Sequence, residues 1–159
     1  MPFHLSLTQP FSFVNPGVLR DGDLRVVLTT THLPNGMGIE SPTYCFMLSV
    51  ENEERAAGHV HLRVGNTDNL VLYQGHIGYG VEARWRGHHF AERATRLILP
   101  LAKHHGINPV WITCDPDNLP SKRTCERLGG VLVEIVDVPK TTLAYRHGAR
   151  RKCRYRVDL

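Results

Sequence analysis

The chain has 159 residues, of which 42% are hydrophobic and 21% charged, and its formal net charge is +4. This composition is that of an ordinary globular protein, so intrinsic disorder is not the default, and the mild positive charge suits either a polyanionic ligand or simple solubility. The length suits one domain over residues 1–159 that needs no disulfide or metal to fold. No apolar run is long enough to span a membrane, and residues 1–10 lack the basic start and apolar core of a signal peptide. We therefore expect a soluble, cytoplasmic protein with no membrane partner.

The four cysteines and ten histidines form no recognisable disulfide or metal-ligand pattern. No Cys-x-x-Cys motif occurs among Cys45, Cys114, Cys125 and Cys153, so these side chains are expected to be reduced thiols. Adjacent histidines point in different directions on a helix, and the spacing fixes no third ligand. We therefore predict that the protein has no metal site.

The first third of the chain predicts strands separated by irregular segments. Residues 1–21 contain several prolines and no sustained period, which indicates an irregular lead-in, with a short edge strand around residues 11–14 as the alternative. Residues 24–30 are rich in Val, Leu and Thr and predict a strand. Residues 31–42 contain Pro and Gly without a helical pattern, so a loop is expected there.

Three successive antiparallel strands are predicted next, over residues 44–50, 56–64 and 70–81. In the second of them, His59 and His61 alternate with apolar residues and so share one face. Two histidines in this arrangement are most often part of a half-exposed polar face.

The stretch from Gly75 to Ala91 is a glycine-rich strand that passes through a short basic turn into a helix. The first turn of a helix has N–H groups without intrahelical partners, and the helix dipole adds positive potential, so this point can bind a phosphate. Gly87 lets the backbone approach an anion closely, and Arg86 adds a planar cationic group. An ordinary strand-to-helix connection is the alternative interpretation.

A helix is predicted over residues 88–105, because apolar residues recur at the spacing that lines one helix face, and Gly106 ends it. Pro100 lies inside this pattern and should kink the helix. Residues 110–114 then predict a buried strand, parallel to residues 70–81 and reached by a right-handed crossover.

The C-terminal part of the chain predicts one more helix and two strands. Asn118 is a natural N-cap for a helix over residues 119–128. Residues 131–138 and 152–157 predict two paired strands. The strongly basic residues 146–156 favour a solvated loop and a charge-protected edge strand over a phosphate or nucleic-acid contact.

Two of these segments resemble motifs of the GNAT acyltransferases. Val81 fits the strand end of motif A, Arg86 its first position and Ala91 its last, whereas the first motif glycine falls on His89. Residues 112–130, with Asn118 in the loop and Leu-Gly at the helix end, resemble motif B. The resemblance covers residues 44–130, and its motifs look most like the branch that contains ribosomal-protein N-acetyltransferases.

This resemblance implies an α+β protein with the GNAT fold: a mixed, mostly antiparallel sheet of about six to seven strands with a V-shaped splay and helices on its faces. It implies acetyl-CoA as the co-substrate. The backbone of Tyr79, Gly80 and Val81 would contact the acyl-pantetheine end, and Asn118 would hydrogen-bond the pantetheine. The diphosphate would be held by Arg86, Gly87, His88, His89, Phe90 and Ala91.

The implied reaction is direct attack of an amine on the acetyl thioester, which requires a base, an oxyanion site and an acid. The family's usual acid is a tyrosine at the position of Cys125, so Cys125 is a candidate acid or a small buried residue. His76 is the preferred candidate base, with a structural histidine as the alternative and Glu82 and Tyr145 as weaker choices.

The leading hypothesis is an acetyl-CoA-dependent N-acetyltransferase that acts on a small-molecule amine or a protein N-terminus. The alternative is a non-catalytic acyl-CoA-binding or sensor domain. Nucleic-acid binding through the basic C-terminal segment is less favoured, and a homodimer is possible. The sequence sets neither the acceptor nor the acyl-chain length.

Overall fold

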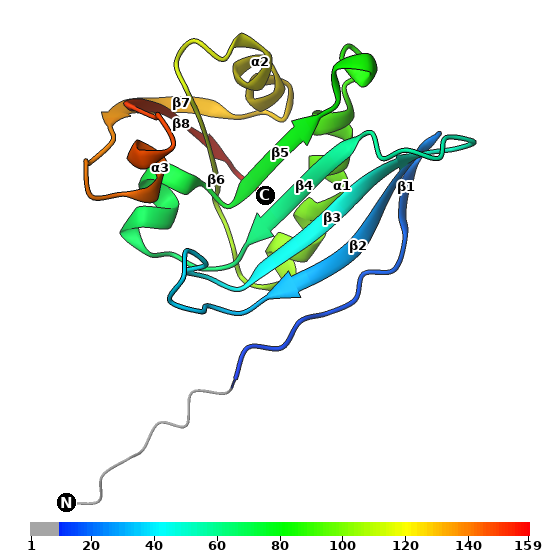
Figure 1. Cartoon of the computed structure of the whole chain (residues 1–159), viewed down its shortest axis with the longest axis horizontal. Helices are drawn as coiled ribbons and strands as arrows, with labels where there is room; N and C mark the ends of the chain where they lie inside the picture. The colour runs from blue at the N-terminus through cyan, green and yellow to red at the C-terminus, as the bar shows by residue number, and fades with distance from the viewer. Residues whose placement is uncertain (1–9) are drawn as a thin grey trace, which may run out of the picture.

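Eight strands form one mixed sheet in the order β1-β2-β3-β4-β5-β6-β8-β7 in the computed structural model, which describes residues 10–159 (Figure 1). All neighbouring strands are antiparallel except β5 and β6. The strands are β1 (Leu19–Asp21), β2 (Leu24–His32), β3 (Thr43–Val50), β4 (Gly58–Arg63), β5 (Ile77–Val81), β6 (Val110–Cys114), β7 (Val131–Asp137) and β8 (Arg151–Val157). This architecture confirms the predicted fold class, with eight strands in place of six to seven.

One face of the sheet carries the core. In β3, Tyr44, Phe46 and Leu48 are buried while the residues between them are partly exposed, because side chains alternate between the two faces of a strand. Helix α1 (Phe90–His104) covers this face and lies behind β3, β4 and β5 in Figure 1. Its buried residues are Phe90, Ala94, Thr95, Ile98, Leu101 and Ala102. The amphipathic pattern of this helix is thereby confirmed.

The connection from β5 through α1 to β6 makes β5 and β6 a parallel pair, as predicted. The two strands pair at a single register position, Ile77 with Ile112. Beyond this position they separate, whereas β4 and β5 stay paired up to Gly58 and Val81. The resulting opening is the V-shaped splay that the family resemblance implies.

Helix α2 (Leu119–Arg127) follows β6, and Asn118 caps it as predicted, because its side-chain oxygen accepts a hydrogen bond from the backbone N–H of Ser121. Strand β8 lies between β6 and β7, so it is an interior strand. The prediction of an edge strand in the basic segment was therefore wrong. Its charges are compensated along the strand, since Lys152 pairs with Asp115 and Arg154 with Glu134.

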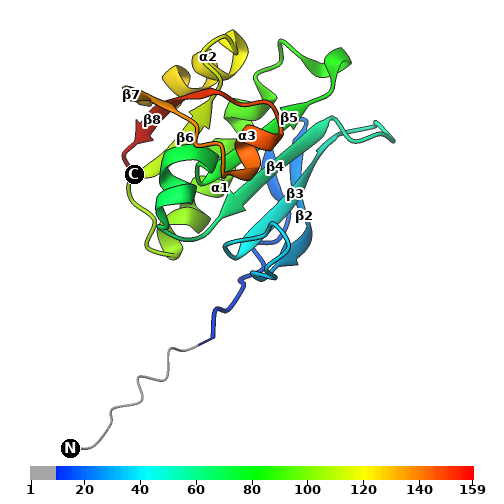
Figure 2. The ribbon, with the colours of Figure 1, turned by 60° about the vertical axis from the view of Figure 1, so that its left-hand side comes forward.

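The structure differs from the predicted elements in three further places. Residues 70–81 were expected to be one strand, but Leu70–Gln74 form the π-helical turn η1 and β5 begins at Ile77. A short apolar run does not distinguish a strand from a buried helical turn, and Gly75, with φ of 75°, ends the turn. β1 lies inside the expected irregular lead-in, and the short helix α3 (Leu143–Arg146) was not predicted. Figure 2 shows α3 in the connection between β7 and β8.

No helix within residues 10–159 has the length and apolar character needed to cross a membrane.

Candidate functional site

Two cavities adjoin each other at the splay between β5 and β6. The first, here called the helix cavity, has a volume of about 530 Å³ and is bounded by the end of β5, the start of α1 and one side of α2. The second, here called the sheet cavity, has a volume of about 680 Å³ and is bounded by β3, β4, η1, the start of α3 and the end of β6. Tyr79, Asn118 and Ser121 line both cavities. A ligand in one cavity can therefore meet a ligand in the other beside these three residues.

The helix cavity has an uncapped helix N-terminus at its floor. The residue before α1, His89, makes no side-chain capping hydrogen bond, and the N–H of Arg93 bonds to the carbonyl of His89. The backbone N–H groups that precede Arg93 in the first turn of α1 have no partner within the helix. They are therefore available to a ligand. Gly87 has φ of 91°, and a Cβ at this position would meet nothing within 4 Å, so the approach to these groups is open.

The charged side chains around the helix cavity are of one sign. Arg86 comes from the turn before α1, while Arg123 and Arg127 lie one helical turn apart on α2. Within the described part of the chain, no Asp or Glu lines this cavity. A site with unpaired helix amides and three guanidinium groups fits a diphosphate or another polyanion.

His89 has the left-handed backbone conformation, with φ of 58° and ψ of 30°. Glycine adopts this conformation without strain, whereas residues with a Cβ do so at a cost. The position aligned with the first motif glycine therefore needs the backbone geometry that glycine favours, and histidine supplies it here. The side chain of His89 is exposed at the cavity wall and is not buried among the helix amides.

The edge of β5 that faces the splay is available to a ligand. Tyr79, Gly80 and Val81 pair with β4 on one side, whereas β6 pairs with β5 only at Ile77. An extended ligand can add to such an unpaired strand edge through backbone hydrogen bonds. This geometry suits the backbone contacts that the family resemblance implies for these three residues.

A group of hydroxyl and thiol side chains lies where the two cavities meet. The Tyr79 hydroxyl oxygen is 2.8 Å from Oγ of Ser121 and 3.8 Å from Sγ of Cys125. Burial raises the pKa of the Tyr79 phenol well above its ordinary value, so the phenol keeps its proton. Ser121 lines both cavities, whereas Cys125 is fully buried and lines neither.

Cys125 is coupled to the neighbouring thiol of Cys114. The hydrogen bond between them and burial raise the pKa of Cys125, while the same hydrogen bond lowers the pKa of Cys114. Cys114 lines the sheet cavity, so the more acidic thiol of the pair is the one at a cavity wall. Cys125 itself fits the alternative of a small buried residue.

His76 is enclosed in the core, with 0% of its surface exposed. Its Nδ1 accepts a hydrogen bond from the backbone N–H of Trp111 at 2.9 Å, and its Nε2 donates to the carbonyl of Gly65 at 2.9 Å. Burial lowers the pKa of His76 and keeps the ring neutral. Both nitrogens are occupied and His76 lines neither cavity, so the geometry corresponds to a structural histidine instead of the expected base. Glu82 and Tyr145 also line neither cavity.

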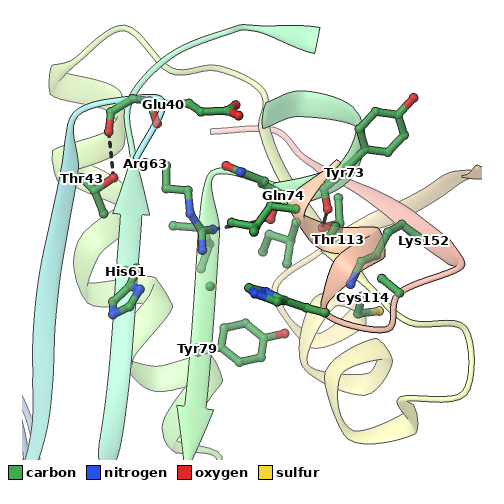
Figure 3. A pocket seen from close by; sticks show the side chains of 18 of the residues that line it. Glu40, Thr43, His61, Arg63, Tyr73, Gln74, Tyr79, Thr113, Cys114 and Lys152 are labelled. Carbon is green, nitrogen blue, oxygen red and sulfur yellow. Dashed lines mark hydrogen bonds between the residues drawn. The ribbon is translucent and has the colours of Figure 1, made fainter. Parts of the chain in front are cut away.

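The sheet cavity is polar, and histidine and arginine side chains of β4 form its floor. His61 and Arg63 both line it, and Figure 3 shows Arg63 pointing toward its centre. Burial, followed by the neighbouring His59 and Arg63, lowers the pKa of His61 to about 4. His61 is therefore neutral near pH 7, and the arginine and lysine side chains that line this cavity are Arg63 and Lys152.

The structure brings together almost all of the residues predicted to bind the cofactor. His88 does not line the helix cavity and instead stacks on the ring of Phe90. The predicted residues that do line it are Tyr79, Gly80, Val81, Arg86, Gly87, His89, Phe90, Ala91 and Asn118. Sequence reasoning missed Arg123 and Arg127, although their i, i+4 spacing on the helix that Asn118 begins was a usable signal.

The sequence of this chain matches that of a known protein family. A profile described as "Acetyltransferase (GNAT) domain" matches residues 15–131, which is more than half of the chain. The chain therefore belongs to the GNAT acetyltransferase family, and the resemblance inferred from the two motifs is confirmed. No curated protein matches the chain in sequence.

Several solved structures share the fold. Ribosomal-protein-S5-alanine acetyltransferase from Vibrio fischeri is 19% identical with a TM-score of 0.58, and the match covers 73% of this chain and 61% of that one. The microcin C7 self-immunity acetyltransferase MccE, solved with acetyl-CoA and AMP, is 18% identical with a TM-score of 0.57, with 74% and 61% covered. A Vibrio cholerae protein is 17% identical with a TM-score of 0.65, with 92% and 100% covered. The chain thus spans about three fifths of the length of the first two proteins.

Proposed function

We propose that the protein is an acetyl-CoA-dependent N-acetyltransferase that transfers the acetyl group directly to an amine. The observation that carries this proposal is the junction of the two cavities at Tyr79 and Ser121. One cavity offers sites for a polyanionic nucleotide, and the other offers a polar site for an acceptor. Family membership and the MccE structure with acetyl-CoA support this choice of co-substrate.

Each part of the helix cavity has a distinct role in holding acetyl-CoA. The first-turn amides of α1 and the guanidinium groups of Arg86, Arg123 and Arg127 would bind the phosphates. The free edge of β5 would pair with the pantetheine arm, and this places the thioester at the junction. Asn118 uses its side-chain oxygen to cap α2, which leaves its amide NH₂ for the pantetheine.

Ser121 is the proposed general acid. Acetyl-CoA supplies a thioester that the acceptor amine attacks, and the departing thiolate must receive a proton. The Ser121 hydroxyl reaches both cavities, and Tyr79 can donate its own proton to Oγ of Ser121 over 2.8 Å. This pair takes the role that the sequence assigned to Cys125. A backbone N–H at the free edge of β5 would stabilise the oxyanion.

His147 is the proposed base. Glu40, Asp115 and His147 are groups at the wall of the sheet cavity that could take the proton from the ammonium. Glu40 accepts a hydrogen bond from Asn69, and Asp115 is paired with Lys152 at 2.8 Å. The ring of His147 has no ion pair or hydrogen bond with the side chains that the structure describes, so its nitrogens are available to an acceptor amine.

The acceptor is an amine of a small molecule or of a peptide. Solved structures of the same fold include a ribosomal-protein acetyltransferase, which favours a peptide or protein N-terminus. A cytoplasmic location, where acetyl-CoA is available and thiols stay reduced, and a homodimer remain predictions.

Calorimetry with acetyl-CoA, followed by a CoA-release assay over a panel of amines and peptides, tests the proposal. We expect saturable binding of acetyl-CoA and turnover with at least one acceptor. Binding without turnover over the whole panel would instead support the non-catalytic acyl-CoA-binding alternative. That alternative is motivated by His89, Thr113 and Cys125, which stand where the family has other residues. Absence of binding would exclude both functions.

A further inference from the structure

Arg63 is held in a fixed position at the floor of the sheet cavity. Its Nη1 donates to the backbone carbonyls of Gln74, at 3.5 Å, and Gly75, at 3.2 Å. The guanidinium lies against Gly78, because a Cβ at Gly78 would be only 3.1 Å from Nη2 and 3.2 Å from Nη1. Glycine at this position of β5 therefore leaves the space that the guanidinium occupies.

The charge of Arg63 is not compensated within the part of the chain that the structure describes. Within residues 10–159, no carboxylate oxygen lies within 4.0 Å of its side-chain nitrogens. The lysine of this cavity, Lys152, is paired with Asp115 at 2.8 Å, and Glu40 is turned toward Asn69. A partly buried guanidinium without a counter-ion has lost some of its hydration, so an anionic ligand would gain a strong interaction there.

The free donors of Arg63 form one edge of the guanidinium. Nη1 is used by the two carbonyls, whereas neither Nε nor Nη2 has a hydrogen-bond partner in the described part of the chain. The Nε and Nη2 N–H groups are parallel, and they match the two oxygens of a carboxylate. Because the protein fixes Nη1, little side-chain freedom remains to be lost when the second edge binds a ligand.

Arg63 also lies close to the proposed point of transfer. Gly78, which its guanidinium contacts, directly precedes Tyr79, and Tyr79 lies at the junction of the two cavities. An anionic group on Arg63 and an amine at this junction can thus belong to one acceptor molecule. Figure 3 shows Arg63 and Tyr79 on the same side of the cavity, opposite Thr113 and Lys152.

We propose that Arg63 binds a carboxylate of the acceptor, so that the substrates are primary amines that carry a carboxylate, such as free amino acids or peptides with an acidic residue near the N-terminus. This inference rests on the proposed acetyltransferase activity for the identity of the sheet cavity as the acceptor site. The competing role for Arg63 is a structural one, namely to fix the turn η1 through its two carbonyl bonds.

Equilibrium binding tests the anion site without requiring turnover. The probes are N-acetyl amino acids, which are the products expected from amino-acid acceptors, and the corresponding carboxamides, titrated into the full chain by calorimetry or NMR. We expect at least one carboxylate to bind about tenfold to a hundredfold more tightly than its carboxamide, and R63Q to remove this difference. N-acetylated acidic dipeptides and inorganic phosphate are titrated separately, to distinguish peptide ligands from phosphate.

Kinetics supply the second readout. In R63Q, the KM for a carboxylate-bearing amine should rise about tenfold to a hundredfold, while kcat/KM for its carboxamide and the KM for acetyl-CoA stay unchanged. R63K keeps the charge but loses the paired donors, so it should recover only part of the preference. R151Q removes one positive charge from an exposed position outside both cavities and is the matched control.

Each result decides between the two roles of Arg63. A carboxylate preference that survives in R63Q, its absence in the wild type, or binding of phosphate alone would overturn the proposal. An equal loss for carboxylate and carboxamide would show that Arg63 is structural. If carboxylates bind through Arg63 but acetyl-CoA does not bind, the anion site stands and the proposed acetyltransferase activity fails.

Discussion

The hydroxyl oxygen of Tyr79 lies 2.8 Å from Oγ of Ser121, and this contact joins the free edge of β5 to the first turn of α2. It stands at the point where the helix cavity and the sheet cavity meet. The pair therefore has access both to the expected thioester and to the acceptor. Burial raises the pKa of the phenol, so Tyr79 keeps its proton near neutral pH and can donate it in this hydrogen bond.

Replacing Ser121 by Ala should remove the proposed proton donor. We expect kcat to fall about 10²-fold to 10⁴-fold, the usual contribution of general acid catalysis, with the Kd for acetyl-CoA changed by no more than about threefold. Y79F should cause a smaller loss, because it removes the relay but leaves the Ser121 hydroxyl. S49A, on β3 and outside both cavities, is the control. If S121A keeps the wild-type kcat, a residue other than Ser121 is the general acid.

The three arginines of the helix cavity should act on the phosphates alone. R86A, R123A and R127A are each expected to weaken acetyl-CoA binding about tenfold, because each removes charge-assisted hydrogen bonds. S-acetylpantetheine lacks the diphosphate, so the weakening should be absent with this ligand. Calorimetry at two salt concentrations measures both effects. Equal losses for both ligands would contradict phosphate binding and indicate a disturbed fold.

His89 permits a test of backbone conformation at the motif position. Because its φ of 58° is strained for a residue with a Cβ, H89G should keep or raise the free energy of unfolding by up to about 1 kcal/mol. H89A retains the strain and should not be stabilised. The Kd for acetyl-CoA should stay within about threefold of wild type in H89G. A tenfold loss of affinity in H89G would show instead that the imidazole itself contacts the ligand.

Stability should depend on pH through the buried histidines. Burial lowers the pKa of His76 in the folded protein, so the unfolded chain binds the proton more readily. The stabilisation is complete above the ordinary histidine pKa of about 6.5 and is lost as the pH falls through the lower pKa of the folded state. The pKa values of His61 and His105 are lowered in the same direction. Thermal unfolding from pH 7.5 to 5 should therefore show a falling Tm.

H76Q separates the structural role of His76 from a catalytic one. It should lower the free energy of unfolding by about 1 to 3 kcal/mol at pH 7, since at least one buried backbone group loses its partner. Its Tm should also depend less on pH than that of the wild type. The pH dependence of kcat in the folded variant should be unchanged, whereas H147Q should lower kcat itself. Loss of the acidic limb in H76Q, the limb on which a general base becomes protonated, would restore His76 as the base.

The sequence by itself determined most of the secondary structure and the position of the turn that is proposed to bind phosphate. The period of α1, the alternation in β3, the cap at Asn118 and the turn at Gly87 are local properties, because each depends on residues within one or two turns of one another. The prediction of a strand over residues 70–74 was wrong because an apolar run of this length fits a strand and a helical turn equally well. The sequence located the motif glycine position at His89. Only the structure showed that His89 adopts the left-handed backbone conformation that glycine favours.

Only the tertiary structure decided which side chains meet. Tyr79 and Ser121 are 42 residues apart, and His76 bonds to groups 11 and 35 residues away, so no spacing rule brings them together. His76 was inferred from its place on the strand, but burial and two backbone partners far along the chain determine its state. Arg63 gave no signal in the sequence. That it has no counter-ion within residues 10–159 depends on every side chain that folding brings near it.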